Sequence, residues 1–214
     1  MLDSDSGTPT EVMGSLRDLQ SFNQRLGGIA TTRDLVLTAA AVSGKKELSL
    51  LEVAAGNGFV PFHVAQEIAQ RGIQLTVTLS DRVASHLPRN GTSSKLVADA
   101  LALPFADSSF DLVSSSLFLH HLSPADVVQF AREALRVSRL AFLVNDLVRH
   151  WLHLALAYAG VPLYRSRLTR HDAPASVRQA YTIDEMRTLL LKSGAANVES
   201  QSRFLYRMGL IAWK

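Results

Sequence analysis

Residues 50–65 read Leu50-Leu-Glu-Val-Ala-Ala-Gly-Asn-Gly-Phe-Val-Pro-Phe-His-Val-Ala65, which predicts a buried strand, a tight turn and the start of a helix. The acid Glu52 stands near the end of the apolar run. Gly56 and Gly58 fit the turn, because glycine adopts positive φ readily and lets the backbone approach a ligand closely. A strand, turn and helix of this kind suit a nucleotide-like ligand.

Composition limits the classes of protein to which the chain can belong. Its 214 residues, 47% of them hydrophobic and 19% charged, are enough for one sizeable α/β domain, which we expect to span residues 15–214. The net charge is +3 with scattered Lys and Arg, so we expect no nucleic-acid partner. The absence of cysteine excludes disulfides, thiolate metal sites and cysteine nucleophiles.

The N-terminal residues 1–14 are polar, with few large apolar groups, and predict a disordered tail. They lack the basic start and apolar run of a secretory signal, which favours a cytoplasmic protein. Elsewhere no stretch reaches the ~18 uninterrupted apolar residues that a spanning helix needs. We therefore expect no membrane span.

Strands and helices alternate from residue 48 onward, and this alternation predicts a doubly wound, Rossmann-like α/β sheet. We expect about seven strands, mostly parallel, and a C-terminal antiparallel hairpin. The expected strands are 48–53, 75–79, 95–98, 110–114, 140–144, 197–205 and 208–213. The expected helices are 16–26, 32–42, 59–71, 124–135, a short apolar helix ending near 158, and 183–193.

Acids follow three of these strands, at Glu52, Asp81 and Asp99. Ligands of doubly wound sheets bind outside the carboxyl ends of the strands, so these residues are candidates for one shared site. An ionised carboxylate such as Asp81 is well suited to accept hydrogen bonds from both hydroxyls of a ribose. A single acid of this kind is more often a turn or cap residue, but three in succession favour a ligand site.

The run Glu52-Val-Ala-Ala-Gly-Asn-Gly58 resembles the first motif of class I S-adenosylmethionine-dependent methyltransferases, with Ala54 replacing the first glycine. The run from Asp99 through Leu103-Pro-Phe and Phe110-Asp-Leu-Val to His120-His-Leu is similar to the type 11 methyltransferase family in order and spacing. This resemblance covers roughly residues 48–145. A dinucleotide fingerprint is disfavoured, because Pro61 stands where its third glycine would be.

The resemblance implies S-adenosylmethionine as cofactor, S-adenosylhomocysteine as product and no metal. It also implies that the N-terminal helices, residues 15–46, form a lid and that an insert at 146–181 caps the substrate. The alternative is that the first segment is simply an exposed amphipathic helix and that the second only covers the edge of the sheet. The predicted cofactor-binding residues are Arg25, Glu52, Ala54, Gly56, Gly58, Asp81, Arg82, Asp99, Ala100 and Ser116.

Several histidines are candidates for a general base, and His121 is the preferred one because it follows the fourth strand. His120, His150 and the pair His171-Asp172 are the others, and each is also explained as a helix-start or surface residue. Because His120 and His121 are sequential, they diverge on a helix and do not predict a metal site.

The acceptor is inferred by exclusion. The chain has Ser114-Ser-Ser-Leu117 where base-modifying methyltransferases often carry an Asn/Asp-Pro-Pro-aromatic run. This favours a small apolar acceptor, such as an aromatic, polyketide-like or quinone-like metabolite methylated on oxygen. The apolar residues that either line its pocket or simply pack on the core are Trp151, Leu152, Leu154, Leu156, Tyr158 and Leu163. The alternatives are a non-catalytic S-adenosylmethionine-binding protein of the same fold and an RNA or protein methyltransferase.

Overall fold

The computed structural model describes residues 8–88, 94–203 and 205–214. In this part of the chain, seven strands form one sheet in the order β3-β2-β1-β4-β5-β7-β6. Strands β1 to β5 are parallel to one another, whereas β7 runs antiparallel to both β5 and β6. This confirms the predicted sheet and its C-terminal hairpin. The strands are β1 (Glu47–Val53), β2 (Gln74–Asp81), β3 (Ser94–Val97), β4 (Phe110–Ser116), β5 (Ser138–Leu147), β6 (Asn197–Arg203) and β7 (Arg207–Trp213).

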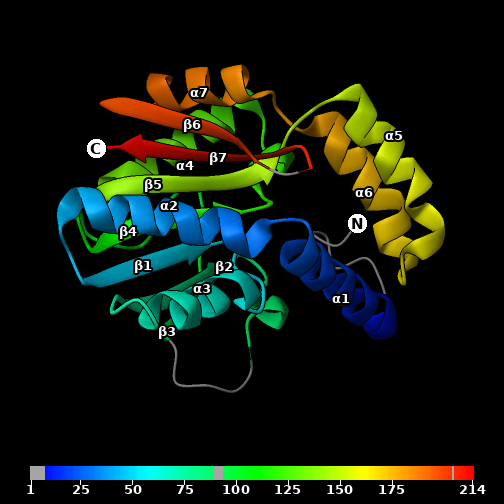
Figure 1. The fold of residues 1–214 in the computed structure, drawn as a ribbon, viewed down its shortest axis with the longest axis horizontal. Coiled ribbons are helices and arrows are strands. Elements are labelled where there is room, and N and C mark those ends of the chain that lie inside the picture. Colours follow the sequence, from blue (N-terminus) through cyan, green and yellow to red (C-terminus); the bar gives the residue numbers. More distant parts are fainter. Residues whose placement is uncertain (1–7, 89–93, 204) are drawn as a thin grey trace.

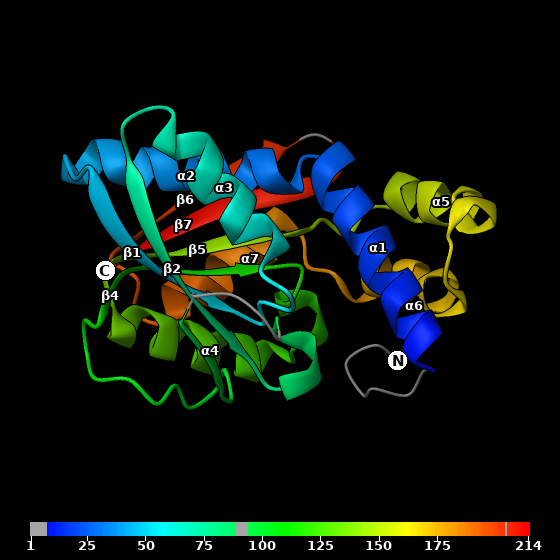
Figure 2. The same cartoon turned by 90° about the horizontal axis from the view of Figure 1, so that it is seen from below.

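Helices cover both faces of the sheet (Figures 1 and 2). One face packs against α2 and α3, and the other against α4 and α7. The helices are α1 (Pro9–Arg25), α2 (Gly28–Ser43), α3 (Phe59–Ala69), α4 (Pro124–Val137), α5 (Trp151–Ala159), α6 (Arg167–Gln179) and α7 (Ile183–Lys192). Short 3₁₀ turns are η2 (Ala84–His86), η3 (Leu119–His121) and η4 (Val161–Leu163).

Two apolar clusters form the core, because successive side chains of a strand point to opposite faces of the sheet. In β1, Leu50 belongs to the cluster under α2 and α3, and Leu51 to the cluster under α4 and α7. Phe130 of α4 and Phe142 of β5 are both fully buried, and their rings meet edge to face at 5.0 Å. This packing fixes the central strands, and with them the positions of the strand ends.

Helices α1, α5 and α6 gather beyond the end of the sheet toward which β5 points (Figure 1). Helix α1 is joined to the start of α6 by buried hydrogen bonds. The Asp18 carboxylate accepts from the backbone N–H groups of Arg165 and Ser166 at 3.0 and 3.1 Å. The Ser166 hydroxyl donates to the Glu11 carbonyl at 2.8 Å. These three helices therefore cover the carboxyl ends of the parallel strands.

The structure differs from the sequence prediction in the expected tail. Residues 1–7 lie outside the described residues, but α1 begins at Pro9, inside the predicted disordered segment 1–14. The reason is a capping box, in which Thr8 accepts from the Glu11 backbone and Glu11 accepts from the Thr8 backbone. Proline at the first helical turn adds to this signal.

Helix α6 was not predicted from its polar sequence. Ser166 caps it by accepting from the Leu168 backbone, and the helix then tolerates Pro174 in its interior. Strand β5 is also longer than the predicted 140–144, beginning directly at Ser138 where α4 ends. Among the described residues, none of the helices has the length and apolar character needed to span a lipid bilayer.

Candidate functional site

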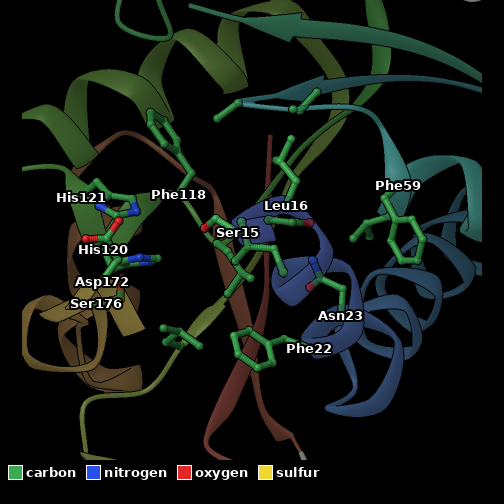
Figure 3. A pocket seen from close by; sticks show the side chains of 18 of the residues that line it. Ser15, Leu16, Phe22, Asn23, Phe59, Phe118, His120, His121, Asp172 and Ser176 are labelled. Carbon is green, nitrogen blue, oxygen red and sulfur yellow. The ribbon is translucent and has the colours of Figure 1, made fainter. Parts of the chain in front are cut away.

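A cavity of about 620 Å³ lies at the carboxyl ends of the parallel strands, under α1, α5 and α6 (Figure 3). Its floor comes from the turn after β1 and from the ends of β2 and β4. Its opposite wall comes from the covering helices, with Leu16, Phe22, Leu156, Tyr164 and Val177 among the apolar residues. Pockets of this size and composition hold small ligands with 70–90% of their surface buried.

The turn after β1 has the open backbone that the sequence predicted. Gly56 lines the cavity with φ of +52°, and a Cβ there would meet no atom within 4 Å, so its face is free for a ligand. Gly58 is buried behind the turn instead, where a Cβ would come within 2.6 Å of Phe62 and 2.8 Å of Leu79. Gly58 thus serves helix packing, and Gly56 forms part of the cavity surface.

Asp81, at the end of β2, holds this turn in place. Its Oδ2 accepts from the Gly56 backbone N–H at 2.9 Å, and its Oδ1 accepts from the Val83 N–H at 2.9 Å. Burial alone would raise the Asp81 pKa, but the nearby His86 and the two backbone donors lower it below its ordinary value. The carboxylate is therefore ionised at neutral pH, with lone pairs remaining for further donors in the cavity.

Glu52 differs from Asp81, although both acids line the cavity. Its side chain is only 2% exposed and accepts a hydrogen bond from the Ser114 hydroxyl on β4. Burial raises the Glu52 pKa to about 7, against the opposing hydrogen bonds of Ser114 and Ser116. Glu52 is thus close to its titration point at neutral pH.

The remaining predicted cofactor residues fall into two groups. Ala54, Arg82, Asp99, Ala100 and Ser116 all line the cavity, and Asp99 also caps a turn by accepting from the Leu101 N–H at 2.9 Å.

Arg25 is exposed at the end of α1 and lies outside the cavity wall. Asn23, two residues earlier, lines the wall instead, and the buried Asn23 Oδ1 has no hydrogen-bond partner among the described residues.

The two adjacent histidines have different environments (Figure 3). His120 is buried, and its Nδ1 lies 2.7 Å from Oδ1 of the buried Asp146 at the end of β5. Burial would raise the Asp146 pKa, but His120 and the backbone donors lower it. His121, the base that the sequence favoured, is exposed yet also lines the cavity, with its ring 4.0 Å from that of His120. Sequence reasoning missed Asp146, although it is an acid at a strand end like the others.

The other predicted candidates lie mostly outside the cavity. His150 caps α5 by accepting from the Leu152 N–H, and the exposed His171 contacts its neighbour Asp172 at 2.9 Å. Asp172 itself lines the cavity, close to His120 in Figure 3. Of the six apolar residues proposed from the sequence for 151–163, Leu156 is the one that lines the cavity.

Arg207, at the start of β7, is a cavity residue that the sequence analysis did not single out. It is 3% exposed, and its Nη1 donates to Asn145 Oδ1 at 2.8 Å. Burial lowers the Arg207 pKa to about 10, so the guanidinium still carries its charge at neutral pH. The available signal was a cation opening the otherwise apolar strand Arg207-Met-Gly-Leu-Ile-Ala-Trp213.

Residues 51–140 match the family model described as a methyltransferase domain. Over this segment the chain is similar to methyltransferase domains. The matched segment contains the Gly56 turn, Asp81, Asp99 and both adjacent histidines, which are the residues that carried the resemblance. Within the described residues, no cluster of three or more His, Asp or Glu side chains that could hold a metal ion accompanies this domain.

A curated relative of the methyltransferase domain is ajmaline N-methyltransferase from Rauvolfia serpentina, 34% identical over 99 residues. The match covers 44% of this chain and 33% of the relative, so the chain spans about a third of the length of that protein.

Two solved structures are similar in fold. A SAM-dependent methyltransferase from Methanosarcina mazei superposes with a TM-score of 0.56 at 18% identity, covering 79% of this chain and 93% of that one. An O-methyltransferase family 2 protein from Planctomyces limnophilus, solved in complex with apigenin, has a TM-score of 0.54 at 16% identity, covering 78% and 50%. Both likenesses are at the level of the fold.

Proposed function

We propose that this chain transfers a methyl group from S-adenosylmethionine to a small, largely apolar acceptor. The observation that carries the proposal is the cavity itself. Its floor holds the strand-end acids and the glycine turn of a methyltransferase domain, and its opposite wall is an apolar surface from α1, α5 and α6. One cavity therefore offers places for both a nucleoside and an apolar partner.

The floor residues fit the cofactor in shape and in chemistry. The open face of Gly56 leaves room for a ligand against the backbone. The ionised Asp81 suits two vicinal hydroxyls, and the unpartnered Asn23 Oδ1 suits a cationic amino group. When bound, S-adenosylmethionine supplies a methyl group made electrophilic by its sulfonium. The residues expected to hold it are Asn23, Gly56, Asp81, Asp99 and Ala100.

The covering helices would orient the acceptor and keep water from the cavity. Phe22 of α1 packs edge to face on Tyr164 after α5, with ring centroids 5.5 Å apart, and both line the cavity. Holding two reactants in alignment can supply on the order of 7–11 kcal/mol of barrier reduction. We therefore assign to this lid the positioning that a direct methyl transfer requires.

We propose His120 as the group that takes a proton from an acceptor hydroxyl. Its Nδ1 is engaged by Asp146 at 2.7 Å, which leaves Nε2 as the nitrogen available to a substrate. A carboxylate on one ring nitrogen fixes the tautomer and orientation of a histidine base. A hydroxyl acceptor benefits from such a base, so we infer oxygen as the methylated atom.

The pair of histidines provides a matched test. His120→Asn keeps a donor for Asp146 but removes Nε2, and we expect the rate on an acceptor hydroxyl to fall by about 10²-fold or more. His121→Asn should stay within about threefold, and S-adenosylhomocysteine should bind both variants normally. The reverse pattern would assign the base to His121, as the sequence favoured.

Calorimetric titration with S-adenosylmethionine and S-adenosylhomocysteine tests the proposed function first, followed by a screen of phenols, quinols and amines for methyl transfer. Micromolar binding followed by turnover is the expected result. Binding without turnover across the screen would favour a non-catalytic binding protein, and no binding of either compound would remove the basis of the proposal. Amine methylation alone would place this chain with its curated N-methyltransferase relative in reaction type.

A further inference from the structure

The buried Arg207 lies in the cavity wall, where the nearby Asp146 carboxylate acts on its charge through space. Across residues 8–88, 94–203 and 205–214, no acidic side chain forms an ion pair with it, and its hydrogen bond goes to the neutral amide of Asn145 at 2.8 Å. Charged side chains are almost never fully buried unless they are paired. Arg207 is therefore an exception that needs an explanation.

The neighbouring polar groups are already engaged with other partners. The Asp146 carboxylate, one residue along β5, accepts from His120 Nδ1, from the His120 backbone and from the Leu147 backbone at 2.7, 3.2 and 2.7 Å. The Asn145 amide donates to the Gly28 carbonyl and to the Thr32 hydroxyl, both at 2.8 Å. Asn145 is thus fixed against α2, and it binds the Arg207 guanidinium without supplying a negative charge.

Two other basic residues lie close to Arg207 among the described residues, Arg203 and His153. Arg203, its register partner on β6, is engaged by Asp34 at 3.0 Å. His153 lines the same part of the cavity, but its Nδ1 contacts the Val148 carbonyl at 2.9 Å, and burial together with the charge of Arg207 lowers its pKa. His153 is therefore neutral at neutral pH. His150, which also contributes to this effect, lies outside the cavity wall. The charged groups near Arg207 are thus Asp146, the pair of Arg203 with Asp34, and any charged molecule that enters the cavity.

The strand order places Arg207 on the acceptor side. Arg207 pairs in register with Leu147 of β5, whereas Asp81 ends β2, and β1, β4 and β5 lie between β2 and β7. Four strand spacings of about 4.8 Å separate the two residues by roughly 19 Å across the sheet. Leu147, the register partner of Arg207, and Leu205, two residues before it, are apolar residues that line the cavity. An anion bound there would carry an apolar body.

We propose that Arg207 binds a carboxylate of the methyl acceptor, and that the substrate class is accordingly a hydroxylated aromatic acid. This inference rests on the proposed function. The guanidinium presents donors in a planar fork that matches a carboxylate, and such charge-assisted pairs fix both position and orientation. With the carboxylate held at Arg207, a hydroxyl on the same molecule would be presented to His120.

Binding to the protein saturated with S-adenosylhomocysteine tests the proposal. The probes are hydroxybenzoate, hydroxynaphthoate and hydroxybiphenylcarboxylate, each measured against its own primary amide. We expect at least one acid to bind about tenfold or more tightly than its amide. Arg207→Gln should abolish that preference, Arg207→Lys should keep part of it, and both should bind S-adenosylhomocysteine within about twofold of the unchanged protein.

Arg203→Gln is the matched control. It removes an arginine from the neighbouring strand, where Arg203 pairs with Asp34 at 3.0 Å outside the cavity wall. The acid preference should survive in this variant. The proposal is overturned if no acid is preferred to its amide, if Arg207→Gln leaves the preference intact, or if Arg207→Gln weakens S-adenosylhomocysteine instead. Failure of S-adenosylhomocysteine to bind the unchanged protein would overturn the proposed function itself.

Discussion

Ala54 holds a left-handed backbone conformation, with φ of +56°, in the turn that begins the cavity floor. For an L-residue this conformation costs roughly 1–2 kcal/mol, because Cβ crowds the following carbonyl, and glycine escapes the penalty. We expect Ala54→Gly to raise the free energy of unfolding by about 1 kcal/mol, measured by urea denaturation. Ala55→Gly, one residue on, is the control and should lower it. Equal effects at the two positions would contradict the argument.

Glu52 makes the stability of the fold depend on pH. Burial raises its pKa from 4.5 to about 7, so the folded protein binds a proton that the unfolded chain releases. This contribution is complete below about pH 4.5 and is lost as the pH rises through 7. Between pH 5 and pH 8 the loss is on the order of 2–3 kcal/mol. We expect Glu52→Gln to remove it, so that the variant gains stability relative to the unchanged protein over this range. If urea denaturation gives the same difference in unfolding free energy between the variant and the unchanged protein at both pH values, the assignment to Glu52 is wrong.

Some site residues follow from the sequence and others do not, for a physical reason. Asp81 and Asp99 could be predicted because a strand end in a parallel sheet fixes where a side chain must lie. The choice between His120 and His121 could not, since it depends on how the short turn η3 presents each ring to Asp146, 26 residues away. Arg207 escaped prediction because its burial arises from the packing of β7 against β5.

At the scale of elements, the lid depends on the junction between α1 and α6. The predicted lid helix and the predicted cap were separate segments of sequence, and neither pattern showed that they meet. Helix α6 has few apolar residues and an internal proline, so its propensity alone is weak. Its first turn is instead stabilised by Asp18, a buried acid 147 residues away in the chain. Tertiary contacts of this kind are outside the reach of local sequence patterns.

Asp18→Ala should therefore loosen the lid. The change leaves the backbone N–H groups of Arg165 and Ser166 without their acceptor, which we expect to cost about 2–3 kcal/mol. Hydrogen exchange should accelerate in α6 more than in the sheet. Gln24→Ala, at an exposed position of α1, is the control and should change neither quantity. Uniform acceleration across the whole molecule would show that the lid does not open as a separate unit.

For the whole molecule, the sheet order assigns the two halves of the cavity to different parts of the chain. The turn after β1 and the end of β2 build the proposed nucleoside half, within the segment that matches the methyltransferase model. The proposed acceptor half is built mainly by α1, α5, α6 and β7, which lie outside that segment, whereas the proposed base His120 lies inside it. This division explains why the cofactor half resembles a family, whereas the acceptor half had to be inferred from the packing.

Ligand binding to the nucleoside half should stabilise the entire domain, because the strands that hold it are part of one core. At 100 times its dissociation constant, S-adenosylhomocysteine should add about 2.7 kcal/mol to the free energy of unfolding. In a domain of this size the melting temperature would rise by roughly 5–10 °C. Asp81→Asn keeps the side-chain shape but removes the charge, and we expect about tenfold weaker binding and a correspondingly smaller rise at the same concentration. Asp184→Asn, an exposed acid on α7, should match the unchanged protein. Adenosine alone should show the same dependence on Asp81, since the residue is assigned to the ribose. A rise with adenosine that ignores Asp81→Asn would place the nucleoside elsewhere in the cavity.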